Sequence, residues 1–406
     1  MENRMNPMNA HTQKCKERVT HTRVLWTIAA LCLLQPLCAN ISFAQVKYSP
    51  FNRPDVTGTT GVTGIRGAGG QNVLITAGFH PSPPPSPTPM STCSPAPSPD
   101  SHGLLYVGPL SGGGNSGSWT QLDYPSSAGI TVTGTVLYGP DNLPPTNVRL
   151  VGSYTTCEDS QNNTGIRNHG ALYEGLPDGS GTWQTIDFPI AQVTPSPFPG
   201  EEVHNTIAHS NMGGLVVGNF DTDLVTGKAF VYDTNANPGS EWTELRNDEA
   251  NPQWRSITAY GIWYNGGTSY TIAGGYSETN SDGIDHGYLV NWDSATRTAS
   301  GWTKYDFENG QIHVQVSHFD GITSDNQGGF YLTGQYLGDT LPPIGGFFAH
   351  VRRMPHRPFG EAHWRQIVYP FSGLTTGDTV FENNVLGVYF LNGTSASYLA
   401  RVQGHR

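Results

Sequence analysis

The sequence is poor in charge and, above all, in lysine. Only 13% of its 406 residues are charged, with 21 basic against 32 acidic side chains and a formal net charge of -11. After residue 44 the lysines are reduced to Lys47, Lys228 and Lys304. Phosphate backbones demand a positive surface that such a chain cannot present. We therefore exclude nucleic acid as a partner.

Long apolar runs are scarce as well. One runs over residues 24–38 and follows several basic residues, an order typical of a secretory signal. It is shorter than the roughly 20 residues that a membrane span needs. Small residues at Ser42 and Ala44 predict cleavage after Ala44. We expect residues 1–44 to be a signal peptide, the rest to have no membrane span, and the protein to be secreted or periplasmic.

Cysteine is the third scarcity, because only Cys93 and Cys157 follow the predicted signal. In an oxidising compartment an even pair predicts a disulfide. Cys93 lies in the Pro/Ser-rich loop 81–101, which should be extended. Cys157 lies in the equivalent loop one repeat later, so both loops should emerge on the same face. We predict a Cys93–Cys157 bond.

What the chain does contain is a repeat of short β-segments. Runs of β-branched and aromatic residues are bounded by Gly, Pro, Asn or Asp, and helical periodicity is missing after the signal. One recurring segment begins with His-Gly, and a Trp-led segment follows it. Successive tryptophans of this set lie 59 to 64 positions apart, which is room for four strands and their turns. The set consists of Trp119, Trp183, Trp242, Trp302 and Trp364.

The ends of the chain complete one more unit. Residues 45–80 resemble the second, third and fourth strands of a unit, and residues 397–402 resemble the missing first strand. With five complete units over 102–396, we predict a single all-β domain over 45–402. It is a six-bladed β-propeller of four-stranded blades, whose last blade combines three N-terminal strands with one C-terminal strand. Radial repetition leaves only short, protected edges.

The units resemble the extracellular HAF repeat family. The resemblance is carried by residues 169–173 (His-Gly-Ala-Leu-Tyr), 183–189 (Trp-Gln-Thr-Ile-Asp-Phe-Pro) and 216–220 (Val-Val-Gly-Asn-Phe). It implies bacterial export and a propeller-like β-fold. It assigns no catalytic residue.

The His-Gly segments are predicted to be first strands lining the central channel. Equivalent residues on a wide ring lie too far apart to share one ion, so we interpret these histidines as hydrogen-bonded structural residues and predict no metal and no cofactor. Two histidine pairs spaced by five should point to opposite faces of a strand and should not chelate. The first set is His102, His169 and His286; the pairs are His204 with His209 and His313 with His318.

A recurring aspartate follows the Trp-led segment, at Asp123, Asp187 and Asp306. Paired carboxylates carry out glycoside hydrolysis. A catalytic pair, however, needs two different environments that separate its pKa values. We interpret a repeated Asp as an acceptor for backbone donors near a turn, and we assign no catalytic residue.

Two groups stand outside the repeat. Trp254, Trp263 and Trp292 lack counterparts in most units, so we expect them to be exposed and name them as candidate ligand contacts, whereas the regular tryptophans should pack between blades. A basic cluster in one loop could hold an anionic partner or be an ordinary solvated loop. Its arginines are Arg352, Arg353 and Arg357.

The sequence favours a monomeric, non-enzymatic binding or surface-interaction protein, because its chemically suggestive residues belong to the repeat. Its ligand is unknown, with a glycan or a cell-surface component as the class considered. The alternative is a propeller-fold enzyme acting on polysaccharide. A non-repeated cluster of carboxylate and aromatic side chains at the channel mouth would favour that enzyme.

Overall fold

A computed structural model describes residues 46–54, 57–82, 93, 99–162, 165–193, 202–222, 227–250, 253–279, 285–308, 310, 312–339 and 342–403. The chain divides into two units, Met1–Phe43 and Ala44–Arg406. The predicted signal peptide lies outside the described residues. Within them, no helix has the length and apolar character needed to cross a membrane.

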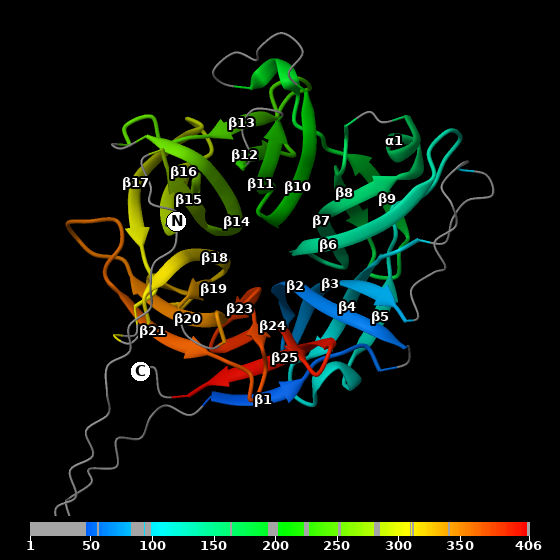
Figure 1. Ribbon diagram of the computed structural model, residues 1–406. Coiled ribbons are helices and arrows are strands. Elements are labelled where there is room, and N and C mark those ends of the chain that lie inside the picture. Colours follow the sequence, from blue (N-terminus) through cyan, green and yellow to red (C-terminus); the bar gives the residue numbers. More distant parts are fainter. Residues whose placement is uncertain are drawn as a thin grey trace, which may run out of the picture. The chain divides into compact units, whose positions relative to one another are not determined.

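The second unit is built from antiparallel sheets arranged around a common axis (Figure 1). The first sheet contains β2 (Gly58–Gly69), β3 (Asn72–Pro81), β4 (His102–Pro109) and β5 (Ser118–Gln121). The second contains β6 (Val132–Leu143), β7 (Asn147–Thr156), β8 (His169–Gly175) and β9 (Gly181–Thr185). The third contains β10 (Val203–Met212), β11 (Leu215–Thr222), β12 (Lys228–Asp233) and β13 (Trp242–Leu245).

An eight-stranded sheet follows, made of two such meanders joined by the single parallel pair Asp285–Val316. Its strands are β14 (Trp254–Gly266), β15 (Ser269–Glu278), β16 (Asp285–Asp293), β17 (Thr298–Tyr305), β18 (Val314–Ser324), β19 (Gly329–Gly338), β20 (Ile344–Arg352) and β21 (Ala362–Ile367). The last sheet contains β1 (Val46–Pro50), β22 (Leu374–Thr375), β23 (Thr379–Phe381), β24 (Asn384–Leu391) and β25 (Thr394–Val402). The helical segments are α1 (Cys157–Asn162), η1 (Gly113–Asn115) and η2 (Ile190–Gln192).

The strands nearest the axis contact one another in a closed cycle, in the order β2, β6, β10, β14, β18, β23 and back to β2. Glycines permit this approach. A Cβ on Gly64 would lie 1.9 Å from the carbonyl oxygen of Tyr138, and one on Gly139 would lie 2.6 Å from the Cα of Ser210. The His-Gly strands β4, β8 and β16 are third from the axis, so the prediction that they line the channel is wrong. The composition of short, similar strands does not identify which of them lies nearest the axis. The glycines at close backbone contacts, such as Gly64 and Gly139, do identify the inner strands.

The two ends of the chain meet in the last sheet. β1 pairs antiparallel with β25, with Val46 opposite Val402. The prediction that the ends pair is confirmed, but the predicted composition of the closing sheet is wrong: it takes only one strand from the N-terminus. β2 and β3 instead begin the first sheet, because β3 pairs with β4 beyond the Pro/Ser-rich loop.

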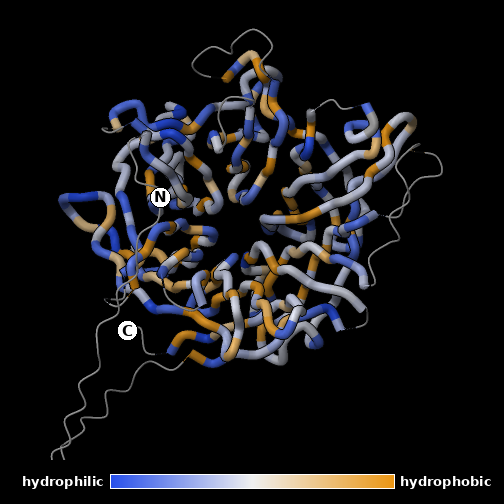
Figure 2. Tube along the Cα trace, in the orientation of Figure 1, coloured by the Kyte–Doolittle hydropathy of each residue, from blue (hydrophilic) through white to orange (hydrophobic). Residues whose placement is uncertain are grey.

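Aromatic side chains fill the space between neighbouring sheets, and the central strands β3, β7 and β15 are buried along most of their length. Apolar residues recur along the strands (Figure 2). Tyr124, which follows β5 of the first sheet, stacks on Tyr154 of β7 in the second sheet, with ring centroids 3.8 Å apart. Trp183 packs 5.4 Å from Tyr124 and 5.1 Å from Tyr173. The predicted packing role of the regular tryptophans is therefore confirmed for Trp183.

Cys93 and Cys157 are joined by a disulfide, with Cα atoms 5.8 Å apart. This is the predicted pairing. It ties the loop between β3 and β4 to the start of α1, which occupies the equivalent loop of the next sheet. Such bonds are typical of oxidising compartments.

Candidate functional site

The strands nearest the axis share a one-residue bulge. Each of β2, β6, β10, β14 and β18 has two or three register shifts, and the one at the equivalent position in every strand leaves a single residue unpaired. In the last sheet Asp378, immediately before β23, takes the equivalent place, and its N–H donates to the carbonyl of Leu386 at 2.9 Å. A bulge re-aims a side chain out of the regular alternation. These residues, here called the channel ring, are Thr63, Tyr138, His209, Tyr260, Asp320 and Asp378.

Five members of the channel ring line one common cavity on the axis, and Asp378 interacts electrostatically with Asp320 beside it. Their positions repeat, but their chemistry does not. On one side the His209 ring lies 5.0 Å from Tyr138 and 4.5 Å from Tyr260. On the other side are two carboxylates. The ring therefore combines aromatic, imidazole and carboxylate groups at equivalent positions, which repeat architecture alone does not require.

The two ring carboxylates have different surroundings. Burial and then the negative charge of Asp320 raise the pKa of Asp378 to about 8, against a hydrogen bond of 2.9 Å from the Thr376 hydroxyl. Burial also raises the pKa of Asp320, but the His318 imidazole, 3.2 Å from its Oδ1, lowers it. With a pKa of about 8, Asp378 is mostly protonated at neutral pH, whereas Asp320 lies within ion-pair distance of His318.

His318 and the aromatic members complete the electrostatics. Burial opposes the charge of His318, but Asp320 outweighs it and raises the pKa of the imidazole. Burial lowers the pKa of His209 to about 4, so that ring is neutral; its Nε2 lies 2.6 Å from Asn219 Oδ1. Burial and the nearby Asp320 raise the pKa of Tyr260 to about 12. The Oδ2 atom of Asp320 has no hydrogen-bond partner among the described residues.

Arg66 closes the channel on one side of the ring. Its guanidinium, from β2, donates to Ser210 Oγ at 3.0 Å and to the Ile262 carbonyl at 2.8 Å, so it crosses to β10 and β14. Burial lowers its pKa, and Asp141 counteracts this. The cavity has a volume of about 10 Å³, roughly that of one water molecule. On the other side of the channel ring from Arg66 is the face where β2, β6, β10, β14 and β18 begin, which we call the upper mouth.

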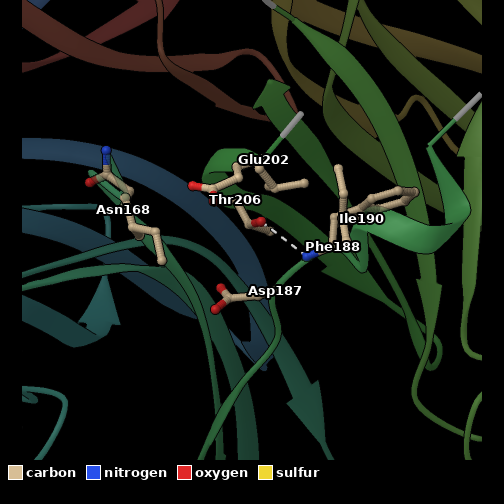
Figure 3. A pocket seen from close by; sticks show the side chains of 8 residues that line it. Asn168, Asp187, Phe188, Ile190, Glu202 and Thr206 are labelled. Carbon is tan, nitrogen blue, oxygen red and sulfur yellow. Dashed lines mark hydrogen bonds between the residues drawn. The ribbon is translucent and has the colours of Figure 1, made fainter. Parts of the chain in front are cut away.

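A second hollow of about 560 Å³, the rim pocket, lies between the end of β9 and the start of β10 (Figure 3). Asp187, Glu202 and Asn168 bring polar groups to it, and the Phe188 N–H donates to Thr206 Oγ1 at 3.0 Å. The Asp187 carboxylate already accepts bonds from within the fold, as described next. It is therefore less available for chemistry than the channel carboxylates.

The repeated histidines and aspartates bind each other. The Nδ1 to carboxylate distance is 2.8 Å for His102–Asp123, 2.7 Å for His169–Asp187 and 2.6 Å for His286–Asp306. In the first two pairs the second carboxylate oxygen accepts the following glycine's N–H, at 3.0 and 2.9 Å. The structural interpretation of both sets is confirmed, although their pairing was not predicted.

His169 gives this arrangement a pH dependence. Its Nε2 lies 2.9 Å from Asp159 on α1 in addition to the Asp187 contact. Burial opposes protonation, but Asp187 and Asp159 outweigh it and raise the pKa to about 9. A raised folded-state pKa gives stability that is complete below the ordinary value of 6.5 and lost as pH rises through 9.

We expect His169→Gln to lower the free energy of unfolding by about 2 kcal/mol at pH 6 and to have little effect at pH 10. Denaturant unfolding at both pH values measures this. His363→Gln, at an exposed position on β21, is the control and should change neither value. An equal loss at both pH values would show that the ion pairs contribute nothing.

The irregular tryptophans do not form an exposed group. Trp292 is buried, with 3% of its surface accessible, so its predicted exposure is wrong. Trp254 stacks on Tyr276 at 3.8 Å, taking the stacking role that Tyr124 has elsewhere. Trp263 lies beside the Arg66 guanidinium at 5.8 Å. Their irregular spacing reflects replacement within the packing.

The three arginines of the basic loop are exposed but differ in their contacts. Arg352 is exposed, whereas Arg353 donates to Thr271 Oγ1 at 2.8 Å and lies over the Phe330 ring. Arg357 lies 3.8 Å from Glu361. Arg353 is thus engaged by the fold, whereas Arg357 forms only a surface ion pair, and the anion site stays a prediction.

The channel ring itself escaped the sequence analysis, although a signal was present. Four of its members directly precede a glycine inside a strand, as in Asp320-Gly321 and Tyr260-Gly261. A glycine inside a strand indicates a bulge or a close backbone approach. His209 and His318, treated only as halves of spaced pairs, both belong to the channel wall. Among the described residues, no three His, Cys, Asp or Glu side chains are grouped so as to hold a metal ion.

Comparison with known proteins gives a fold and no family. No family model matches the sequence, and no curated protein matches it. A solved structure of a protein of unknown function from Dyadobacter fermentans is similar, with a TM-score of 0.50 and 11% identity over 89% of this chain and 99% of that chain. The NanB sialidase from Streptococcus pneumoniae has a TM-score of 0.49 and 7% identity over 87% of this chain and 71% of that one. The first likeness concerns the fold alone, and the second supports no inference about activity.

Proposed function

We propose that this protein is an exported six-bladed propeller that hydrolyses glycosidic bonds at the upper mouth of its channel. The observation that carries the proposal is the chemical divergence of the channel ring, where Asp320 and Asp378 occupy equivalent positions in different environments. Enzymes make one of two carboxylates an acid and the other a base or nucleophile by placing them in different environments.

The count of six blades rests on two observations: the closed cycle of six inner strands, and the single residue pair that joins the two halves of the eight-stranded sheet. That sheet is held between its halves by one parallel pair, so we count it as two blades. Export is supported by the Cys93–Cys157 disulfide, by the basic and apolar order of residues 1–44, and by the resemblance to the extracellular HAF repeats.

The chemistry assigns one role to each carboxylate. Asp378, protonated at neutral pH, donates its proton to the leaving oxygen as the bond between that oxygen and the anomeric carbon breaks. Asp320, held beside the His318 imidazole at 3.2 Å, stabilises the positive charge that develops on the sugar ring when it is in its carboxylate form. Water then supplies a hydroxyl group to the sugar and a proton to the Asp378 carboxylate. Because Arg66 closes the far side, only the end of a glycan chain reaches the ring.

The test is release of reducing ends from a panel of soluble polysaccharides by purified residues 45–406. We expect Asp378→Asn and Asp320→Asn each to lower the rate about 10³-fold. The wild-type rate should also fall above pH 8, as Asp378 loses its proton. Asp123→Asn, the same change at a repeated position, is the control and should keep the rate. No release by the wild type, or full activity of Asp378→Asn, would refute the proposal.

Binding without catalysis is the second candidate, favoured by the rim pocket. Its volume of about 560 Å³ lies within the range of small-ligand sites. Glycan binding by the wild type without any bond cleavage would support this function instead.

A further inference from the structure

A turn on the way into the last inner strand contains an anomalous phenylalanine. The Ser372 N–H donates to the Tyr369 carbonyl at 3.1 Å, which closes a four-residue turn with Pro370 and Phe371 at its centre. Phe371 has a φ of 64°. A turn with proline followed by a positive φ is of type II, and its third position normally takes glycine. Phenylalanine here strains the backbone.

Burial of the Phe371 side chain does not compensate for this backbone strain. It is 96% exposed, whereas Met354, next among the exposed large apolar side chains of the described residues, is 46% exposed. Glycine at this position would remove both the strain and the exposed ring. Strain that persists without a structural benefit points to a function.

The turn is nevertheless held firmly. Tyr369 stacks on Tyr389 with ring centroids 3.7 Å apart, and its N–H donates to Thr375 Oγ1 at 3.0 Å. The Ser372 hydroxyl donates to the Tyr369 carbonyl at 2.8 Å, and the Gly373 N–H donates to the Phe390 carbonyl at 2.9 Å. The aromatic ring is thus presented on a pre-organised base, which lowers the entropic cost of binding.

The position of the turn connects it with the channel. It follows β21 and leads directly into β22, and Asp378 comes seven residues after Phe371. The inner strands begin at the upper mouth, and the Gly373 N–H bonds the Phe390 carbonyl near the β24–β25 hairpin, so Phe371 lies on the same face of the ring as the upper mouth.

We propose that Phe371 is a stacking platform for a sugar ring of a glycan bound at the upper mouth. A single exposed ring is far smaller than the roughly 800 Å² per partner that a stable protein interface buries. Its flat apolar face instead matches the apolar face of one pyranose ring. The choice of a glycan as ligand rests on the proposed function, whereas the strain and exposure of Phe371 do not.

The test measures binding in the Asp378→Asn background, so that hydrolysis does not enter. Affinities for cello-, xylo-, malto- and chito-oligosaccharides are determined by calorimetry. We expect at least one series to bind, Phe371→Gly and Phe371→Ala to weaken that binding at least tenfold, and Phe371→Trp to retain it. Phe371→Gly should keep the thermal midpoint within about 1 °C, because strain relief offsets the greater freedom of the unfolded chain. Met354→Ala is the matched control for an exposed apolar side chain and should bind as its parent does.

The two proposals fail separately. If none of the four series binds, or if Phe371→Gly binds as tightly as its parent, the platform is refuted, even when the wild type cleaves glycans. If binding depends on Phe371 and the wild type cleaves nothing, the platform stands and the hydrolase is refuted.

Discussion

Removing β1 is expected to lower the midpoint of thermal unfolding by about 10 °C, the equivalent of several kcal/mol. β1 covers the outer edge of β25 from Tyr398 to Val402. Tyr48 packs 5.5 Å from Tyr369 and 5.8 Å from Tyr398, and its hydroxyl accepts the Val368 N–H at 3.0 Å. Deletion of residues 45–50 therefore exposes a strand edge and a set of buried rings.

The deletion has a control that separates strand pairing from general damage. A synthetic peptide of residues 45–52, added to the shortened protein, should restore part of the midpoint in proportion to its concentration. Differential scanning calorimetry measures both effects. An unchanged midpoint after deletion would mean that the ring does not depend on closure by its ends.

Arg66→Met should lower the free energy of unfolding by about 3 kcal/mol. Methionine replaces the apolar stem of the side chain, but the change deletes the bonds to Ser210 and Ile262 and removes the positive charge near Asp141. Burial already raises the pKa of Asp141, with Arg66 counteracting it. Without Arg66 that pKa rises further, so the destabilisation should grow as pH rises above the folded-state pKa that Asp141 has in the wild type.

Denaturant unfolding of four proteins checks this prediction. Arg66→Met combined with Asp141→Asn should recover part of the loss, because no buried carboxylate is left without its nearest countercharge. Arg246→Met, which breaks the exposed ion pair with Asp248, should change stability by less than about 0.5 kcal/mol. If Arg66→Met lowers the free energy of unfolding no more than Arg246→Met does, the Arg66 guanidinium does not stabilise the fold.

Much of the fold could be predicted from sequence, and its errors have one physical cause. Strand segments, the disulfide and the pairing of the two ends follow from local patterns that each segment carries by itself. The grouping of strands into sheets does not, because four short strands of similar composition leave their distance from the axis open. That distance is decided by close approaches such as Gly64 to Tyr138, which involve two neighbouring sheets.

The candidate site was harder to predict for a related reason. A bulge breaks the alternation of side chains, so period-two reasoning cannot tell that Asp320 faces the channel rather than the core. Its relation to Asp378 also depends on the register of separate sheets, which no single segment encodes. Trp254 illustrates the converse: an irregular residue in the sequence takes a regular place in the packing.

The position of β1 also sets an order of events for the growing chain. β1 is the first of the described strands along the chain and its partner β25 the last, so a chain that folds from its N-terminus as it is exported is an open arc with an unpaired edge at each end until β25 arrives. Cys93 and Cys157, only 64 positions apart, can link the first two sheets long before that. Until β25 emerges, the incomplete arc is the species most exposed to proteases and to pairing with a second unfinished chain.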